Sequence, residues 1–312
     1  MENKVYNFNK IQNLKHGENT FQSAALYNYD KEIDWNLVQG IELNYNDILN
    51  ATTTIEILAE FYDVSAFAAV KFNNPAVVAL GSDVNNAFEK AIDSDPIALF
   101  GAIVGFSKEI SPILARKLIE FQIDTIVAPE FSEETIRVLN KYPNIKAIQI
   151  NTPLEKIQNF TDEEIKLTPF GALIQEKDKK ELDVKSFKVV TKKKPEQREV
   201  EDMIFAHKVV KHAKSSASVI AKDLRTLSIV CGQANQVDSV EVALNKVCDS
   251  VKDSVVAVDL AIENVGFVQS AAQERVCAII QPFGTAKDED VVECADKLGV
   301  SMIATGVAHL KG

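Results

Sequence analysis

The chain has 312 residues, of which 46% are apolar and 25% are charged, with only 12 glycines and 9 prolines. Such a composition is typical of a packed globular protein, excludes disordered and collagenous classes, and at this length favours about two domains. The formal net charge of −11 argues against nucleic acid as a partner, because proteins that bind the phosphate backbone carry a basic surface.

No apolar run approaches the ~20 residues that cross a bilayer, and the N-terminal residues lack the pattern of a secretory signal. We therefore expect a cytoplasmic protein that makes no membrane contact. Cys231, Cys248, Cys277 and Cys294 lie far apart and do not have the spacing of a zinc site. They are expected to be buried free thiols, and no metal is expected.

The sequence before residue 100 predicts a helix, two strands and a second helix. Ile55, Leu58 and Phe61 have the spacing of an amphipathic helix, which we expect to begin near Asn50. Two buried strands, VSAFAAVKF and AVVALG, follow and are separated by the turn residues NNP. The next helix is expected directly after Gly81, because SDVNN supplies capping residues.

The alternation of strands and helices continues to residue 150, which indicates an α/β protein. We expect strands in PIALFGAIVGF and DTIVAP, a helix in SPILARKLIEF, and a helix in SEETIRVLNKY with a capping box at Ser132. Residues 151–198 are less regular, and PFGALI and FKVV are candidate edge strands. A domain boundary is placed near Lys192–Pro195, where KKK is interpreted as part of a solvated linker.

The C-terminal part of the chain repeats the same pattern. A helix is expected in EVEDMIFAHKVVKHAK, then paired strands in SASVIAKD and RTLSIVCG, then Gly232 and another helix. The similarity of AVVALGSDVNNAFEKA to LSIVCGQANQVDSVEVALNKV favours a duplicated unit. The chain ends with a strand in VCAIIQPFGT, a helix capped by Gly299, and a strand in VSMIATG.

Common catalytic templates give little guidance. The chain has no G-x-G-x-x-G, no Walker lysine loop, no G-x-S-x-G, no H-E-x-x-H and no zinc-deaminase signature. Ligands of α/β sheets collect at the carboxyl ends of the strands, so polar residues near predicted strand ends are the candidates. They are Lys15-His16-Gly17, Lys71, Asp124, Ser215-Ser216 and Gln233 to Gln236.

Segments along almost the whole chain resemble, in order, those of the bacterial-type AICAR transformylases. They are LKHGENTFQ, VKFNNP, NAFEKAIDSDPIALFGAIV, IVAPEFSEE, VVTKKKPEQREVEDMIFAHKVVKHAKSSA, CGQANQVDSV and IIQPFGTAKDEDVVECAD. The resemblance implies transfer of a formyl group from 10-formyltetrahydrofolate to the 5-amino group of AICAR in IMP biosynthesis, with no metal. In that family an IMP cyclohydrolase domain precedes the transformylase, and we expect this chain to lack cyclohydrolase activity.

The resemblance also implies the architecture and the partners. It gives an α/β fold of two cytidine-deaminase-like three-layer α/β/α lobes, a duplicated unit, with residues 1–192 as the first lobe and connecting segment and residues 193–312 as the second. The family forms an intertwined homodimer with its active sites at the subunit interface. AICAR or a related nucleotide is the expected ligand.

Site residues follow from the resemblance, position by position. Lys71 takes the place of the catalytic lysine. Asp124 takes the place of a carboxylate that faces the substrate, although it is equally well explained as a turn residue before its strand. The other substrate-binding positions are Lys15, His16, Gly17, Asn74, Ser216 and Gln236, and the folate-binding positions are Asp259, Gln281 and Pro282.

Several positions depart from the family pattern. Phe72 replaces a histidine that assists proton transfer, and loss of a positioned acid–base group typically removes ~10²–10⁴ in rate. Ser216 replaces an asparagine and Gln236 an arginine. Lys15 and His16 replace an arginine and a tyrosine, so the two-pronged arginine contact to phosphate is absent.

Three interpretations remain open, and in the third the pocket accepts a different nucleotide or a ligand without phosphate. In the first, the chain is an AICAR formyltransferase in which neighbours such as His16 supply the missing groups, with impaired standard activity. In the second, it is a catalytically silent homologue that binds a nucleotide or acts as a dimer partner. The aromatic folate wall is also lost, because Ala261, Ile262 and Asn264 stand at its aromatic positions, while apolar segments such as FGAIVGF persist. This selective placement of the changes favours impaired standard chemistry.

Overall fold

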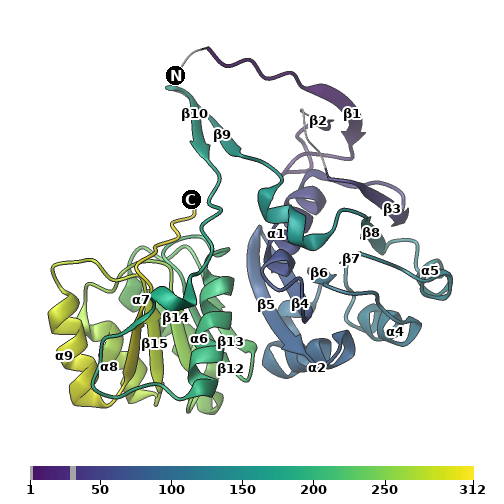
Figure 1. The fold of residues 1–312 in the computed structure, drawn as a ribbon. Helices are drawn as coiled ribbons and strands as arrows, with labels where there is room; N and C mark the ends of the chain where they lie inside the picture. Colours follow the sequence, from purple (N-terminus) through teal and green to yellow (C-terminus); the bar gives the residue numbers. More distant parts are fainter. Residues whose placement is uncertain (1–2, 29–32) are drawn as a thin grey trace. The chain divides into compact units, whose positions relative to one another are not determined.

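The computed structural model describes residues 3–28 and 33–312, apart from the side chains of Asn159, Cys248 and Asp249 (Figure 1). By contacts among residues the chain divides into two compact units. Unit 1 comprises Met1–Asp63, Val70–Asn73 and Phe100–Lys180, and unit 2 comprises Val64–Ala69, Asn74–Leu99 and Glu181–Gly312. Each unit is therefore assembled from separate stretches, whereas the predicted lobes, 1–192 and 193–312, are continuous and stay a prediction.

The β-sheet of unit 2 mixes parallel and antiparallel strands. The parallel part is β14–β15–β16, and β12 pairs antiparallel with both β13 and β14. The strand order is β11-β16-β15-β14-β12-β13-β5-β4. The bounds are β4 Ser65–Lys71, β5 Asn74–Gly81, β11 Lys188–Val189, β12 Ser218–Lys222, β13 Arg225–Val230, β14 Val255–Val258, β15 Ala278–Gln281 and β16 Ser301–Ala304.

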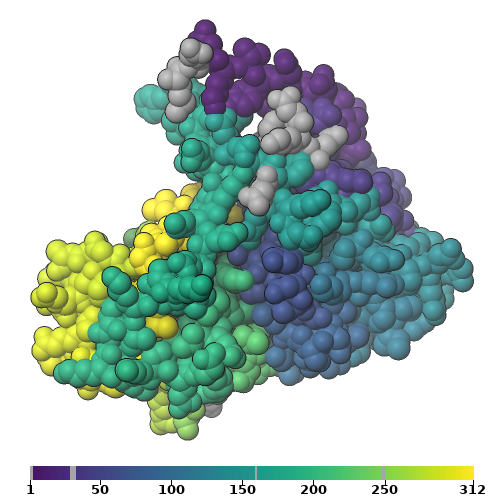
Figure 2. All heavy atoms as spheres, viewed as in Figure 1, coloured from purple at the N-terminus to yellow at the C-terminus, as the bar shows by residue number. Residues whose placement is uncertain are grey.

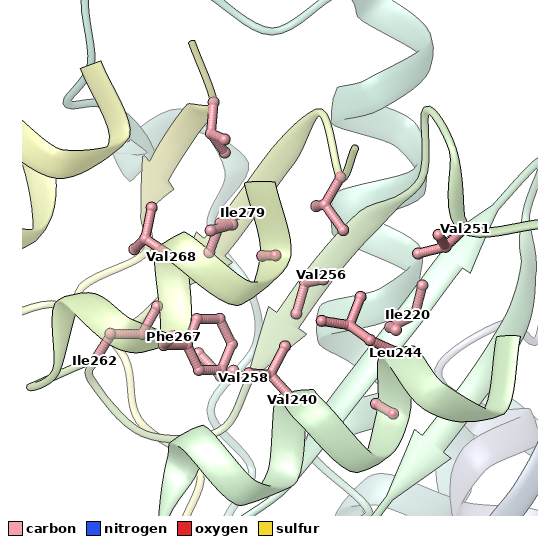
Figure 3. Close-up of a cluster of buried hydrophobic side chains, with 14 of the residues drawn as sticks. Ile220, Val240, Leu244, Val251, Val256, Val258, Ile262, Phe267, Val268 and Ile279 are labelled. Carbon is pink, nitrogen blue, oxygen red and sulfur yellow. The ribbon is translucent and has the colours of Figure 1, made fainter. Parts of the chain in front are cut away.

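Helices cover both faces of this sheet. Helices α7, α8 and α9 pack on one face around a cluster of buried side chains that includes Phe267, Leu244 and Val256 (Figure 3). Helix α6 packs against β12, β14 and β15, but its residues are not part of that cluster. Because Val256 and Val258 belong to the cluster while the alternate residues of β14 do not, α6 covers the opposite face.

Some helices of unit 2 begin or end at caps that the sequence provides. Gly299, at φ 71°, ends α9 in the left-handed conformation, as predicted. The C-terminal part of the chain, which contains α9, reaches the surface (Figure 2), and the charged residues Glu289, Asp290 and Lys297 of α9 are exposed. The bounds are α2 Val84–Ser94, α3 Pro96–Leu99, α6 Gln197–Val210, α7 Gln236–Val247, α8 Val265–Gln273 and α9 Asp288–Leu298, with 3-10 turns η2 Val184–Ser186 and η3 Cys248–Val251.

Unit 1 contains a second set of strands, in which β6, β7 and β8 are parallel and β3 pairs antiparallel with β8. Helix α1 packs on β6, where Gly105 permits contact with Thr54 and Leu58. Two hairpins, β1–β2 and β9–β10, complete the unit. The bounds are β1 Asn9–Leu14, β2 Ala24–Asn28, β3 Trp35–Gln39, α1 Tyr45–Ala59, β6 Ile103–Phe106, α4 Pro112–Glu120, β7 Thr125–Ala128, α5 Glu133–Leu139, β8 Lys146–Ile150, η1 Leu154–Asn159, β9 Glu163–Thr168 and β10 Gly171–Glu176.

The predicted α/β class is confirmed, whereas the duplicated cytidine-deaminase-like lobes stay a prediction. Two element predictions and one capping prediction are wrong. Ser132 caps α5 by accepting from the amide of Thr135, but no reciprocal capping box forms, because Thr135 is not a glutamate or glutamine. Helix α1 begins at Tyr45 rather than near Asn50, because Asn44 and Asp47 form a reciprocal capping box. The start of PIALFGAIVGF forms α3 rather than a strand, since Asp95 caps it through the amide of Ala98. Within the described ranges, no helix has the length and apolar character needed to span a membrane.

Candidate functional site

Polar side chains of unit 2 converge at one edge of its sheet. The carboxyl ends of β13, β14 and β15 lie at the same edge as the amino end of β12, because β12 is antiparallel to its neighbours. Ser216 precedes β12, Asp259 directly follows β14, and Gln281 ends β15. Three of the residues assigned from the family resemblance therefore share this edge, which is where ligands of such sheets bind.

Asp259 is fully buried at the end of β14. Its Oδ1 atom accepts a hydrogen bond from the amide of Ala217 at 3.0 Å, and its backbone carbonyl accepts one from the amide of His309 at 3.2 Å. Its Oδ2 atom is buried and accepts no hydrogen bond of ordinary geometry from the residues that the structure describes. Burial raises the pKa of Asp259, while hydrogen bonds from Ser215 and Ala217 act in the opposite direction.

Ser216 is far from Asp259 in the sequence but lies at the same edge, because the next residue, Ala217, hydrogen-bonds Asp259. Its amide donates to the carbonyl of Gln233 at 3.3 Å, and the amide of Gln233 donates back at 3.1 Å. The hydroxyl of Ser216 is buried and, in the described part of the chain, also lacks a partner. Buried polar atoms are nearly always hydrogen-bonded, so these two oxygens make this sheet edge a candidate for a ligand site.

Asn74 is attached to this edge from β5. Its side-chain oxygen accepts a hydrogen bond from the amide of Lys214 at 3.1 Å, and the carbonyl of Lys214 accepts one from the amide of Gly232 at 2.8 Å. Gly232 has a φ of 67°, a conformation that glycine adopts without strain. The side-chain oxygen of Asn74 thus fixes the backbone segment that precedes Ser216.

Gln236 and Gln281 both hold the segment 259–264, which follows β14. The amide nitrogen of Gln236 donates to the carbonyls of Leu260 and Ala261, each at 2.9 Å. The side-chain oxygen of Gln281 accepts from the amide of Ile262 at 2.7 Å. We call residues 259–264 the folate loop, after the family segment that they resemble. Pro282, next to Gln281, is buried, and its carbonyl accepts from the amide of Gly306 at 2.8 Å.

The C-terminal segment closes the same edge, a feature that the sequence did not reveal. The backbone of Lys311 exchanges hydrogen bonds with Ser215, donating to its hydroxyl at 3.0 Å and accepting from its amide at 2.9 Å. The ring of His309 lies 5.5 Å from the ring of His207 on α6. The only signal in the sequence was the position of His309 in the family's terminal motif.

The candidate residues of unit 1 form separate structures. Lys15, His16 and Gly17 belong to a tight loop in which the amide of Gly17 donates to the carbonyl of Gln22 at 2.7 Å. A side chain at Gly17 would meet Gln22, which explains the glycine. The carbonyl of His16 accepts from the amide of Tyr45 at 3.2 Å, so the loop lies at the start of α1.

Asp124 takes part in an ion-pair network. The ammonium group of Lys146 lies 3.1 Å from Asp124 Oδ2 and 3.0 Å from Asp47 Oδ2. Burial raises the pKa of Asp47, and its hydrogen bonds with Asn44 and Lys146 act against that rise. Asp124 therefore has a structural partner, as the capping or turn interpretation allowed, and its side chain remains 46% exposed.

Lys71 ends β4, next to a two-residue turn. Phe72 and Asn73 have φ values of 51° and 59°, which residues other than glycine adopt at a cost. The amide of Asn73 donates to the side chain of Asn50 at 2.7 Å. Phe72 is 88% exposed. The histidine that the family places there would therefore be at the surface of this chain.

A cavity of about 180 Å³ in unit 2 was not anticipated from the sequence. Strands β5 and β13 are paired at Ala79 and Arg225. The hydroxyl of Thr226 accepts a hydrogen bond from the amide of Val78 and donates one to the carbonyl of Val78. The cavity is lined by Pro75, Ala76, Ser94, Asp95, Ala98, Thr226, Leu227, Ser228, Ile229 and Lys246. Pro75 follows Asn74 and Ile229 lies one residue before the end of β13, so part of the cavity lining adjoins the polar edge described above.

The three cysteines whose side chains the structure describes do not favour a nucleophilic thiol. Cys231, Cys277 and Cys294 are free but half-buried, so the prediction of buried thiols is only partly correct, since part of each residue reaches the surface. Burial raises the pKa of Cys231 to about 11 and that of Cys277 to about 12, which disfavours the thiolate. The side chain of Cys248 lies outside the described part. No group of metal-ligating side chains occurs within 3–28 and 33–312.

The chain belongs to the AICARFT/IMPCHase bienzyme family, whose model matches residues 1–246. Its relatives include the bifunctional purine biosynthesis protein PurH of Thermoanaerobacter sp. strain X514, 39% identical over 98% of this chain and 60% of the relative. PurH of Caldicellulosiruptor bescii is 37% identical over 96% of this chain and 59% of the relative. PurH of Bacillus thuringiensis strain Al Hakam is 36% identical over 99% of this chain and 61% of the relative.

The chain thus spans about 60% of the length of these relatives. Among solved structures, Acinetobacter baumannii RibD is similar at a TM-score of 0.27 and 10% identity, over 83% of this chain and 74% of that chain. This likeness is too slight to identify the fold. The family membership confirms the resemblance read from the sequence.

Proposed function

We propose that this chain is an AICAR transformylase homologue that transfers the formyl group of 10-formyltetrahydrofolate to AICAR, with impaired standard activity. The observation that carries the proposal is the polar edge of unit 2. Asn74, Ser216, Gln236, Asp259 and Gln281, which the family resemblance assigns to AICAR and folate, are connected there by one set of hydrogen bonds. Membership of the family supplies the substrate classes.

The reaction is an acyl transfer without redox change. The 5-amino nitrogen of AICAR attacks the formyl carbon, a new carbon–nitrogen bond forms, and the bond from that carbon to N10 of the folate breaks. One proton leaves the attacking amine and one proton is taken up by N10, so the products are formyl-AICAR and tetrahydrofolate. Lys71 is the proposed group that stabilises charge on the formyl oxygen.

Proton transfer is the step expected to be slow. Phe72 has no ionisable group, so the proton of the amine must pass to another residue or to water, and a lost acid–base group typically lowers the rate ~10²–10⁴-fold. Ser216 offers one short hydroxyl where the family has an amide. Its unpartnered, buried oxygen is available to a substrate group. These two positions make slow turnover the proposed property of this chain.

Two hydrophobic hairpins support a homodimer as the working form. In the first hairpin, Ile11 of β1 is 47% exposed and Phe8, directly before β1, is 54% exposed. In β9–β10, Leu167 is 86%, Phe170 101% and Leu173 61% exposed. Large exposed apolar groups on narrow hairpins are typical of surfaces that another chain covers. Light scattering behind a sizing column tests this, with a dimer expected and a monomer at micromolar concentration contradicting it.

The alternative function is a catalytically silent, cytoplasmic homologue that binds a nucleotide or partners another chain. The hydrogen bonds of Gln236 favour it, because both amide protons already bond to the folate loop and the arginine charge is gone. Titration calorimetry with AICAR and with 10-formyltetrahydrofolate, run beside a turnover assay, separates the two functions. Binding of both with turnover supports the transferase, and binding of a nucleotide without turnover supports the alternative.

A further inference from the structure

We infer that Gln236 is a positioning residue that fixes the folate loop, and that it thereby sets the affinity for the folate rather than for AICAR. The inference rests on the proposed function for the identity of the ligands. The hydrogen bonds themselves do not depend on it. Gln236 begins α7 and is half-buried beside the loop.

The side-chain amide of Gln236 has its donors fully committed. A glutamine amide has two N–H donors, and those of Gln236 serve the carbonyls of Leu260 and Ala261 at 2.9 Å each. Its oxygen faces the amide of Glu263 at 3.4 Å. The side chain therefore spans the loop from one end to the other. It has no N–H left for a phosphate or carboxylate of a ligand.

The loop is held from its other sides as well. The amide of Ile262 donates to Gln281 at 2.7 Å, and Gln281 in turn contacts the sulfur of Met302 at 3.1 Å. The Ile262 side chain is fully buried in the cluster between α7, α8 and the sheet (Figure 3). Gln281 and Ile262 thus anchor the middle of the loop, and Gln236 fixes the carbonyls on the N-terminal side of Ile262.

This arrangement separates the two ligands. The loop contributes Leu260 and Ala261, whose backbone orientation depends on Gln236, so a loosened loop presents its surface to the folate in many conformations. Ordering it then costs free energy on binding, which weakens affinity. Gln236 was itself assigned to AICAR by the resemblance, but its N–H donors are bound to the loop. Two other positions assigned to AICAR, Asn74 and Ser216, are held by backbone hydrogen bonds that do not involve the Gln236 side chain. Loss of Gln236 is expected to raise the folate KM selectively.

Two variants and a matched control test the inference. Gln236→Met keeps the length of the side chain and removes the amide. Gln236→Glu keeps an oxygen toward Glu263 but loses the donors to Leu260 and Ala261. Gln269→Met makes the same substitution at an exposed position of α8. The readouts are hydrogen exchange of the peptide that covers residues 259–264 and the separate KM values for 10-formyltetrahydrofolate and AICAR.

Gln236→Met and Gln236→Glu are expected to accelerate exchange in the loop about tenfold or more, since the hydrogen bonds that they remove oppose local opening. Both are also expected to raise the folate KM about tenfold while the AICAR KM changes less than about twofold. Gln269→Met should match the wild type. Unchanged loop exchange, or an equal rise in both KM values, overturns the inference.

The same experiment distinguishes the inference from the proposed function. If the wild-type chain shows no turnover, the transferase proposal fails, and the dissociation constants of the two ligands from calorimetry replace the KM values. Faster loop exchange with a weaker folate affinity in Gln236→Met then still supports the inference. Faster exchange with no folate binding by the wild type overturns its claim about affinity.

Discussion

Ser216 and Gln233 exchange two backbone hydrogen bonds, 3.3 Å in one direction and 3.1 Å in the other. The pair joins the segment before β12 to the segment after β13 and extends their antiparallel pairing beyond the last ladder residues, Ser218 and Val230. Because the amide and the carbonyl of Ser216 are both used in this pair, its hydroxyl is the one polar group of the residue without a partner in the described part of the chain. The geometry around residue 216 is therefore fixed by the main chain, and the chemistry depends on the side chain placed there.

Restoring the family residues should raise the rate of formyl transfer. The double variant Phe72→His, Ser216→Asn adds a titratable ring and a side-chain amide, and we expect kcat to rise about 100-fold because a positioned acid–base group contributes at least that much. Steady-state release of tetrahydrofolate measures it. Phe100→His, which adds a histidine at another exposed phenylalanine, is the control. A double variant no faster than the wild type would show that these positions do not limit turnover.

Asp259→Asn should stabilise the folded chain most at neutral and alkaline pH. The folded-state pKa of Asp259 is raised above 3.8 by burial, so the folded state binds a proton more readily than the unfolded chain does. The contribution of Asp259 to the free energy of unfolding is therefore most favourable at low pH, and it is lost as the pH rises through the pKa of the folded state. The variant, which cannot ionise, escapes that loss.

Thermal unfolding from pH 4 to pH 8 checks this expectation. The melting temperature of Asp259→Asn minus that of the wild type should be positive at pH 8 and shrink as the pH falls toward 4. Asp63→Asn, at an exposed site, supplies the reference. A difference that is independent of pH, or that grows in acid, would show that Asp259 is not held in a disfavoured ionised state.

Lys146→Met should destabilise unit 1 more than Asp124→Ala. Removing the lysine leaves the carboxylate of Asp47, whose side chain is only 3% exposed, without its cation, and such a loss typically costs about 3–5 kcal/mol. Asp124 is 46% exposed, and removing an exposed partner costs about 1 kcal/mol or less. Urea unfolding followed by circular dichroism measures both. Equal effects would mean that Asp47 does not depend on Lys146.

Much of the fold follows from local patterns in the sequence. The apolar runs that predict β4, β5, β12 and β13 are long and bounded by turn residues, and all four strands are present. The start of α1 was misplaced because the decisive capping box involves Asn44, in a stretch with no apolar periodicity. Helix α3 is only 4 residues long, too short to show a helical period.

The candidate site was predictable in its residues and not in its hydrogen bonds. The family resemblance brings Ser216, Asp259 and Gln281 together, and strand order places them at one edge. The partners of Gln236 could not be foreseen, because they depend on the backbone path of residues 259–264. That path is set by Ile262 packing into a core that α7, α8, α9 and the sheet form together, a tertiary contact that no local sequence pattern shows. All the residues assigned to the site, Lys71 and Asp124 included, stay predictions.

Formyl transfer by the purified chain and by Lys71→Ala tests the central claim most directly. Release of tetrahydrofolate from 10-formyltetrahydrofolate is followed in the presence of AICAR, with Lys141→Ala, an exposed lysine, as the matched control. We predict slow turnover that depends on AICAR, is unchanged in Lys141→Ala and falls to background in Lys71→Ala. Background rates in the wild type, or equal rates in the wild type and Lys71→Ala, would contradict the claim that this chain is a formyltransferase acting through Lys71.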